Sequence, residues 1–308
     1  MTIATKKFEF PALTAGPPSR RNWYKELLDD PGCRGRPIKV REAYESHRES
    51  FYAKQVQLFA VAVSNPVTPD QALIKYLEKQ KRQPNIDDVE NDLASQDVNC
   101  SVIWARPPRN ILDLIMSLQK QILDLVGADL YIMPSQNLHL SVIELSHRHP
   151  VSHLRAVVEE ISLDRIQSML NACGASPTSK HRPKLVFPQI NIDNMGIALS
   201  FVPSSDQIYT YHHLRADLHT QALESGISID MCYTAPSAHI TLGRFVGNEY
   251  FKKDEGRKEF LRFIGKLNAN LKEFQDEWAV GKKEGLELQS GYLKFGRQKE
   301  KADVIGTC

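Results

Sequence analysis

Beyond about residue 100, short apolar segments of strand character alternate with amphipathic helical segments, and this order restricts the chain to few architectures. Apolar residues at helical spacing over 111–126 predict a helix that starts after Pro107-Pro108 and stops at Gly127. A similar order recurs in a second half, which predicts an α+β fold with two antiparallel sheets and outer helices around a central cleft. The expected strands are 101–105, 130–133, 138–145, 185–192, 197–202, 238–245 and 286–295, and the other expected helices are 152–170, 206–224 and 254–274.

The first hundred residues differ in character from the rest. Residues 1–38 are rich in Pro, Gly and Arg and are expected to be irregular, whereas helical patterns cover 38–63 and the segment after Pro69. A polar and acidic stretch over about 82–97 is typical of a linker or an exposed loop. The predicted domains are an N-terminal extension over 1–99 and a bilobal domain over 100–308, with lobes at roughly 100–180 and 181–300.

Composition argues against several classes of protein. The net charge is +2, from 39 Lys and Arg against 37 Asp and Glu, so no overall basic excess indicates a protein that coats duplex nucleic acid. The five cysteines are scattered and none forms a C-x-x-C pair, which argues against a disulfide scaffold and a cysteine-based zinc site. The start of the chain lacks the apolar core of a signal peptide, and the strongest apolar run, 58–63, is too short for a membrane span. We therefore expect an intracellular protein of the cytoplasm, the nucleus or both, with no membrane contact, cofactor or metal.

Two short motifs carry the functional hypothesis. The sequences HLSV, which begins at His139, and HITL, which begins at His239, lie about a hundred residues apart, and both fall in predicted strands. Because side chains alternate between the two faces of a strand, each histidine shares a face with the hydroxyl residue two positions later, Ser141 or Thr241. The apolar residues between them face the other way, so each strand presents an imidazole and a hydroxyl to one side.

Such a pair suits the opening of a cyclic phosphate. One imidazole removes a proton from the attacking water and the other gives a proton to the leaving oxygen, which two histidines can do near neutral pH when one is protonated. The hydroxyls can donate to the nonbridging oxygens, where charge builds in the transition state. The alternative is that these are ordinary strand histidines whose hydrogen bonds are made by neighbouring residues.

The paired motifs resemble those of the two-histidine (2H) phosphoesterase superfamily, and HITLGRF over 239–245 and Asn137-Leu138 before the first motif strengthen the likeness. The chain looks like the RNA ligase/cyclic nucleotide phosphodiesterase-like (LigT-like) members of a fungal or other eukaryotic branch. The resemblance covers roughly residues 100–296. It implies a bilobal fold with two histidines across a groove, His139 and His239 as the acid–base pair, and Ser141 and Thr241 as the phosphate-binding residues.

The expected function is therefore metal-independent hydrolysis of a 2′,3′-cyclic phosphate on an RNA end or a nucleotide. The reverse reaction, which joins ends in a 2′–5′ linkage, uses the same groups, and a cyclic phosphate of ADP-ribose is a further candidate substrate. A noncatalytic RNA- or nucleotide-binding module that retains the groove is the alternative from a different class. Protein partners are not predicted.

Two further residues are candidates for substrate contact. Arg244 follows the second motif, as arginines do in members of the family that the chain resembles, although it could equally lie on the surface. Tyr292 lies in the last predicted strand and could stack on a base, but aromatic residues more often serve packing.

Other clusters of basic residues have simpler interpretations. The histidines at 147, 149 and 153 do not match a zinc-enzyme signature. The histidines at 212, 213 and 219 are expected on the solvated face of a helix, and so are the lysines and arginines between 252 and 262, with attraction of a polyanion as the alternative for the latter.

Overall fold

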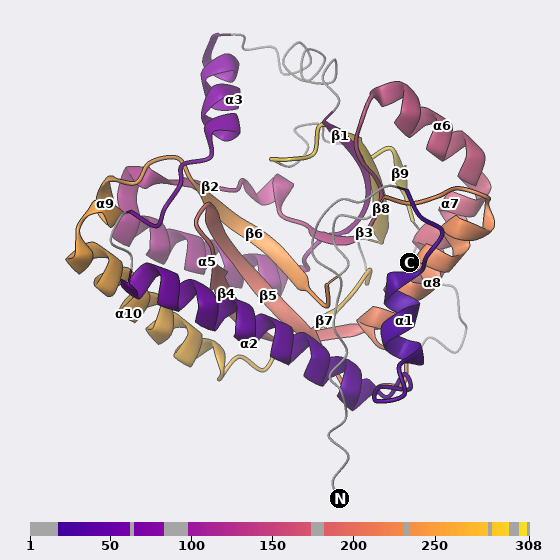
Figure 1. Ribbon diagram of the computed structural model, residues 1–308, viewed down its shortest axis with the longest axis horizontal. Coiled ribbons are helices and arrows are strands. Elements are labelled where there is room, and N and C mark those ends of the chain that lie inside the picture. Colours follow the sequence, from indigo (N-terminus) through magenta and orange to yellow (C-terminus); the bar gives the residue numbers. More distant parts are fainter. Residues whose placement is uncertain are drawn as a thin grey trace, which may run out of the picture.

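Two antiparallel sheets form the centre of the molecule, which is known from a computed structural model (Figure 1). The structure describes residues 18–61, 65–82, 98–173, 182–230, 235–282, 285–295 and 302–306. One sheet has the strand order β2 (Leu130–Ile132), β6 (Ala238–Phe245), β5 (Gly196–Pro203), β4 (Lys184–Ile192) and β7 (Trp278–Ala279). The other has the order β3 (Leu140–His149), β1 (Asn99–Ala105), β8 (Leu286–Gly291) and β9 (Val304–Ile305). The predicted α+β class with two antiparallel sheets is confirmed.

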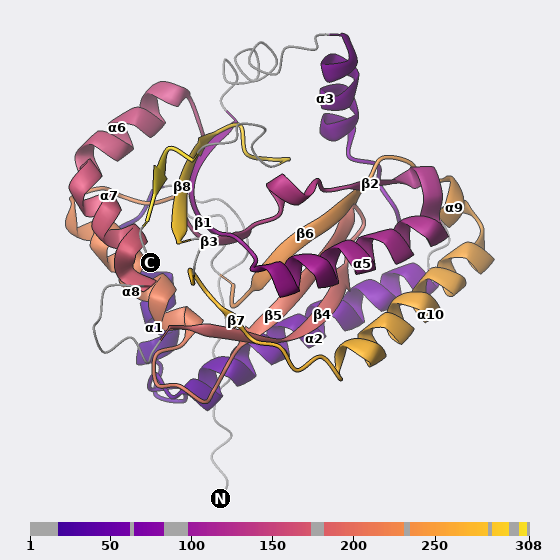
Figure 2. The same ribbon diagram turned by 180° about the vertical axis from the view of Figure 1, so that it is seen from behind.

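Helices pack on both sheets (Figures 1 and 2). The five-stranded sheet is packed by α2 (Pro37–Val61), α5 (Arg109–Val126) and α10 (Asp254–Leu271). The four-stranded sheet is packed by α6 (Val151–Ile161), α7 (Leu163–Leu170) and α8 (Tyr211–Glu224), and α1 (Trp23–Asp29) lies on α8. The short helix α9 (Glu249–Lys252) precedes α10, and α3 (Gln71–Arg82) projects at one end of the molecule. Single turns of 3-10 helix occupy Gly127–Asp129, Ser135–Asn137 and Asn171–Cys173.

The two sheets meet where β3 lies against β6, the strands associated with the two motifs. Each sheet also takes a strand from the other half of the chain, because β2 pairs with β6 and β8 pairs with β1. The sheets are therefore interleaved in sequence, and their contact brings residues a hundred positions apart to one place.

Local chemistry explains the end of α5 and the turn between β4 and β5. The stripe of apolar residues on α5 is buried, and the helix ends where Gly127 takes a φ of 67°, a conformation that glycine adopts without steric cost. The hairpin between β4 and β5 turns on Asp193, whose carboxylate accepts hydrogen bonds from the backbone N–H groups of Met195 and Gly196, both at 2.7 Å. These signals are local, which is why the sequence predicts them well.

Several expected boundaries are wrong. Helix α1 lies within the stretch expected to be irregular, and its N-cap is Asn22. The helix expected over 152–170 is two helices, because Ser162 has a φ of 72° and caps the second of them. Helix α8 begins at Tyr211 rather than near 206, because Thr210 forms a capping box with His213. The last long strand stops at Gly291 instead of continuing to 295. Most of the expected acidic linker, 83–97, lies outside the described residues.

The histidines of α8 also differ from expectation. His212 and His219 are 0% and 1% exposed rather than solvated, because α1 and β3 pack on this helix. The Nε2 atom of His212 donates to the carbonyl oxygen of Tyr24 at 2.8 Å, and its Nδ1 atom then accepts from the Tyr44 hydroxyl at 3.0 Å. The charged face of α10 is solvated in most places, but Arg257 is buried and bonds backbone carbonyls. Across the described residues, no helix combines the length and the apolar composition that a membrane span requires.

Candidate active site

Burial along the two motifs follows the predicted alternation. Leu140, Val142, Ile240 and Leu242 are buried, at 0% or 1% exposure, and anchor the motifs in the core. The histidines and hydroxyl residues of the two motifs, which alternate with these apolar residues, are partly exposed. One detail differs from expectation, because β3 begins at Leu140 and the first histidine lies just before it.

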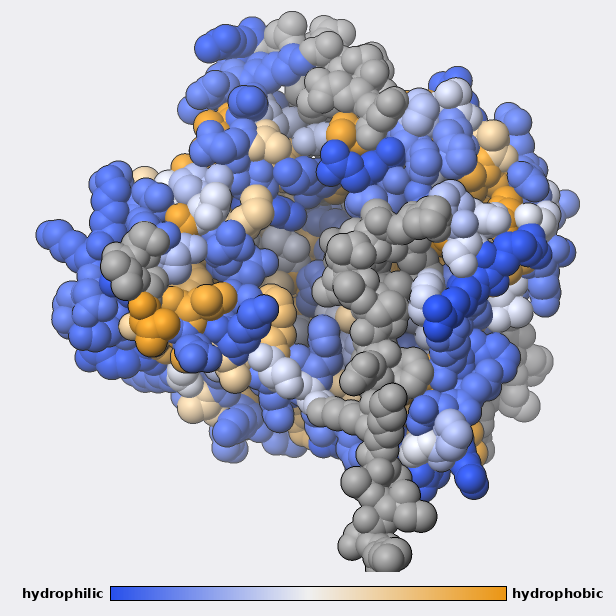
Figure 3. Space-filling view, viewed as in Figure 1, coloured by the Kyte–Doolittle hydropathy of each residue, from blue (hydrophilic) through white to orange (hydrophobic). Residues whose placement is uncertain are grey.

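Both motif histidines line one cavity of about 440 Å³ at the contact of the two sheets. Ser141, Thr241, Arg244 and Tyr292 line the same cavity, so all six predicted site residues are brought together: His139, Ser141, His239, Thr241, Arg244 and Tyr292. A hollow opens at the centre of the face shown in Figure 3, and hydrophilic residues form much of its surroundings. The sequence therefore identified residues that lie around a single cavity.

The ring of His139 is held from two sides. Its Nδ1 atom donates a hydrogen bond to the carbonyl oxygen of Asn137 at 2.7 Å, since a carbonyl can only accept. The ring also stacks on the Trp104 indole, with 3.6 Å between centroids and 10° between planes. In the neutral ring the proton therefore lies on Nδ1, which leaves Nε2 with its lone pair.

His239 is held in a similar way. Its Nδ1 atom lies 2.9 Å from the hydroxyl oxygen of Ser237, two residues earlier, just as the partner of His139 is two residues earlier. Each imidazole is thus fixed through Nδ1 by a group that immediately precedes its motif. Fixing a ring through one nitrogen sets the orientation of the whole imidazole.

A buried arginine ties the two motif regions together. The Nε atom of Arg215, on α8, donates to the carbonyl oxygen of Val142 in β3 at 2.9 Å. Its Nη1 atom donates to the carbonyl oxygens of Ala235 at 3.0 Å and Ser237 at 3.4 Å, in the segment before β6. The hydroxyl groups of Tyr24 and Tyr44 receive further hydrogen bonds from this guanidinium. Arg215 therefore connects both motif regions to the N-terminal helices α1 and α2.

Both histidines are poor bases in the ligand-free molecule. Burial lowers the pKa of His139 to about 3, and nearby Arg106 and His239 lower it further against the opposing hydrogen bond to Asn137. Burial likewise lowers the pKa of His239 to about 4, with contributions from Arg215, Arg244 and His47. Both rings are therefore neutral at pH 7 in the ligand-free molecule.

The two hydroxyl residues are available to a ligand. Within the described ranges, neither Ser141 Oγ nor Thr241 Oγ1 forms a hydrogen bond to a protein group. Both line the cavity with the histidines. A phosphate oxygen that accepted from either hydroxyl would satisfy a donor that the protein leaves open.

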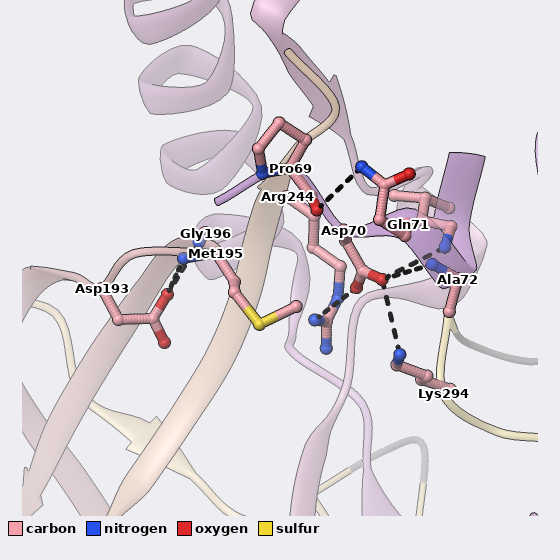
Figure 4. A network of polar contacts seen from close by, with 10 residues as sticks. Pro69, Asp70, Gln71, Ala72, Asp193, Met195, Gly196, Arg244 and Lys294 are labelled. Atoms are coloured by element: carbon pink, nitrogen blue, oxygen red, sulfur yellow. Dashed lines mark hydrogen bonds and ion pairs between the residues drawn. The ribbon is translucent and has the colours of Figure 1, made fainter. Parts of the chain in front are cut away.

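Arg244 belongs to a charged group at the edge of the cavity (Figure 4). Its Nη1 atom lies 3.1 Å from a carboxylate oxygen of Asp70, and Lys294 Nζ lies 3.4 Å from the other. Asp70 is 1% exposed and also caps α3 through the backbone N–H groups of Ala72 and Leu73. One carboxylate thus holds two cations beside the cavity, and the group keeps a net positive charge.

Tyr292 follows β8 and packs as well as lining the cavity. Its ring stacks on Tyr76 of α3, with 6.3 Å between centroids and 26° between planes. Burial raises the pKa of the Tyr292 hydroxyl to about 12, and Asp70 raises it as well while Arg244 lowers it. The packing interpretation of Tyr292 therefore has direct support, and its ring remains partly exposed to the cavity.

A second pocket of about 280 Å³ adjoins the cavity. The two spaces share His239, Thr241 and Arg244. One wall of the second pocket is formed by α2, with the side chains of Tyr44, His47, Arg48 and Phe51. The N-terminal segment thus contributes to the site, which the sequence did not indicate.

Bulges in β3 bring further residues to the cavity. Two irregularities in the pairing of β1 with β3, between Ile103 and Trp104 and between Ser101 and Val102, place Ser141, Glu144 and His147 opposite Trp104, Val102 and Cys100 in turn. Every third residue of β3 therefore faces the cavity here, where regular alternation would present every second one. Glu144, His147 and Cys100 all line it as a result.

The remaining histidines of the first cluster lie apart from the cavity lining. His149 Nε2 lies 2.6 Å from Asp230, and its ring packs against that of His153, with 4.1 Å between centroids. The cluster at 147, 149 and 153 therefore does not act as one unit. Comparison with known protein families, with curated proteins and with solved structures finds no match to this chain.

Proposed function

We propose that this chain is a phosphodiesterase that hydrolyses 2′,3′-cyclic phosphates of RNA ends or nucleotides with His139 and His239. The observation that carries the proposal is that both imidazoles line one cavity, each fixed through Nδ1 and each followed by an open hydroxyl. Two anchored imidazoles and two free donors match what in-line attack at phosphorus requires.

The proposed reaction balances without a further reactant. One imidazole takes a proton from water as the new oxygen–phosphorus bond forms. The other, protonated, gives its proton to the 2′ or 3′ oxygen as the bond from that oxygen to phosphorus breaks, which leaves a phosphomonoester. Ser141 and Thr241 donate to the nonbridging oxygens, whose charge increases in the transition state. Either histidine can take either role, depending on which ribose oxygen leaves.

Electrostatics around the cavity favour an anionic substrate. Arg244 and Lys294 together carry one more charge than Asp70 neutralises, and Arg106 contributes to the potential at His139. A bound phosphate anion raises the pKa of a nearby imidazole, because it favours the charged form. Substrate binding therefore supplies the condition under which one of the two neutral rings becomes the acid.

The proposal includes membership of the 2H phosphoesterase superfamily and its bilobal fold. Its support is the paired motifs together with two antiparallel sheets that meet at the cavity. The adjoining pocket under α2 favours a substrate with a second nucleotide, such as an RNA end. Formation of a 2′–5′ linkage is the reverse of the same chemistry.

One observation favours a second candidate, a module that binds RNA or a nucleotide without turnover. Burial lowers the pKa of both histidines to about 3 and about 4, which leaves the ligand-free molecule without an imidazolium at pH 7. If anion binding does not restore a proton to either ring, the cavity binds phosphate and does not cleave it.

Turnover of the four 2′,3′-cyclic nucleotides in excess chelator separates the two candidates. We expect hydrolysis by the native chain and its loss in His139→Ala and in His239→Ala. His153→Ala is the matched control, because this exposed histidine lies outside the cavity lining and should leave the rate unchanged. Tight binding without turnover by the native chain would support the binding module instead, and a strict need for added divalent metal would contradict the mechanism.

A further inference from the structure

Three side chains of different chemistry lie close together among the residues that line the cavity, and the proposed reaction uses none of them. Cys100 Sγ lies 3.6 Å from His147 Nδ1, and a carboxylate oxygen of Glu144 lies 2.8 Å from the same nitrogen. All three potential ligand atoms lie within 4.8 Å of one another. Two neighbouring strands supply them, since Cys100 is on β1 and the other two are on the bulged part of β3.

The geometry differs from that of a nucleophilic triad. In a catalytic triad of thiol, imidazole and carboxylate, the thiol contacts one ring nitrogen and the carboxylate contacts the other. The imidazole can then accept the proton of the thiol while the carboxylate stabilises the resulting positive charge. Here the thiol and the carboxylate both approach Nδ1 of His147. The three potential ligand atoms lie close to one another, as the ligand atoms of an ion do.

A second observation indicates that Glu144 could bind a cation. Glu144 is 5% exposed, and in the part of the chain that the structure describes, its Oε2 atom is buried without a hydrogen-bond partner. A buried carboxylate oxygen without a partner is costly, and buried carboxylates are normally paired with a cation or bound to a metal. The residue lines the cavity, from which an ion could enter.

The donor set identifies the ion. A cysteine sulfur, an imidazole nitrogen and a carboxylate oxygen are the three ligand types of zinc sites, and calcium and magnesium prefer oxygen alone. Ligand atoms around tetrahedral zinc lie about 3.2–3.6 Å apart, given bonds of about 2.0–2.3 Å. The sulfur–nitrogen distance already fits, and the nitrogen–oxygen distance needs to open by about half an ångström.

We infer that Cys100, Glu144 and His147 form a three-ligand Zn²⁺ site whose fourth position faces the cavity. The site is separate from the imidazoles that act on phosphorus, so zinc is not a reactant in the proposed hydrolysis. It holds the bulged strand β3 to β1 and adds positive charge beside the anion-binding groups. The sequence argued against a zinc site built on cysteine pairs, and this site uses a single cysteine.

Metal binding by the full-length chain tests the inference directly. The purified protein is stripped with chelator and titrated with Zn²⁺, and Co²⁺ is used as a spectroscopic probe. We expect one tight equivalent of zinc and, with cobalt, the intense near-ultraviolet absorption of a thiolate ligand. Cys100→Ser, Glu144→Gln and His147→Ala should each weaken zinc binding by about 100-fold or more.

Matched controls separate the site from adventitious binding. Cys33→Ser removes a buried cysteine elsewhere in the fold, and His153→Ala removes an exposed histidine close to the site in sequence, so both should bind zinc as the native chain does. Circular dichroism confirms that each variant is folded. Zinc affinity that is unchanged in the three ligand variants, or cobalt absorption without a thiolate band, would overturn the inference. Because this experiment measures zinc binding, a negative result would not count against the two-histidine proposal. Likewise, an absence of turnover would not count against the zinc site.

Discussion

The Nδ1 atom of His139 donates to the carbonyl oxygen of Asn137 at 2.7 Å, which fixes both the orientation of the ring and its tautomer. A carbonyl cannot donate, so the proton of the neutral ring lies on Nδ1. The other ring nitrogen, Nε2, then carries the lone pair with which the ring can act as a base. The fold therefore determines the chemistry of this histidine before any substrate binds.

The pH dependence of catalysis follows from the two lowered pKa values. kcat/KM reports the ionisation of the free enzyme, and a cyclic phosphodiester keeps a single negative charge across the usual pH range. Because the pKa values of His139 and His239 are about 3 and about 4, the form with one protonated ring becomes rarer as the pH rises. We expect kcat/KM to fall between pH 5 and pH 8, and kcat, which reports the complex, to peak at higher pH. A value of kcat/KM that rises through pH 6.5 to a plateau would contradict this.

Removal of either cavity hydroxyl tests its role in the transition state. Ser141→Ala and Thr241→Val should each lower kcat by about 10- to 100-fold with a smaller change in KM, because the hydrogen bonds strengthen as charge builds on phosphorus. Ser141→Thr and Thr241→Ser keep the donor and serve as controls that should retain most of the activity. Steady-state kinetics on a cyclic mononucleotide gives both parameters, and a change confined to KM would assign these hydroxyls to ground-state binding alone.

Replacement of Arg215 tests whether it holds the two motif regions together. Arg215→Leu leaves the carbonyl oxygens of Val142 and Ala235 without their donor in the core, and we expect it to lower the free energy of unfolding by about 3–5 kcal/mol. The ion pair of Arg165 with Glu224 is partly exposed and is screened by solvent. Arg165→Leu should therefore lower the free energy of unfolding by less than about 1 kcal/mol. Equilibrium unfolding in urea measures both, and equal small effects would show that Arg215 is dispensable for the fold.

The pocket under α2 predicts a preference for RNA over mononucleotides. Stacking of a second base on Phe51 should raise kcat/KM for a cyclic-phosphate-ended oligonucleotide about tenfold or more over the mononucleotide. Phe51→Ala should remove most of that advantage and leave mononucleotide turnover unchanged. Phe187→Ala, which changes an exposed ring outside the pocket lining, is the control. Equal rates on both substrates by the native chain would contradict the prediction.

Much of the site was predictable because it rests on local rules. Alternation along a strand places His239 and Thr241 on one face and buries the residues between them, and this holds for any regular strand. The α+β class followed from the order of segments. Alternation does not predict the cavity-facing residues of β3 beyond Ser141. Bulges there change which side chains face the cavity, and they bring Glu144 and His147 to it. Nothing in the sequence indicated these bulges.

Long-range pairing accounts for the rest of what the sequence did not reveal. Asp70 and Arg244 are 174 positions apart, and neither neighbourhood indicates that they meet. The polar surface of α8 resembles that of an exposed helix, and His212 is buried only because α1 and α2 supply the tyrosine groups that satisfy it. Contacts of this kind depend on the packing of whole elements, which local patterns do not encode.

Nitrogen NMR of the labelled histidine rings tests most directly whether the two imidazoles act on one phosphorus. The protein is titrated with a 2′- or 3′-mononucleotide, the products of the proposed reaction, and the rings are assigned with the two alanine variants. We predict that His139 and His239 respond at the same ligand concentration and that bound phosphate raises the pKa of at least one of them. A response from one ring alone, or from the two rings at different concentrations, would contradict the shared site.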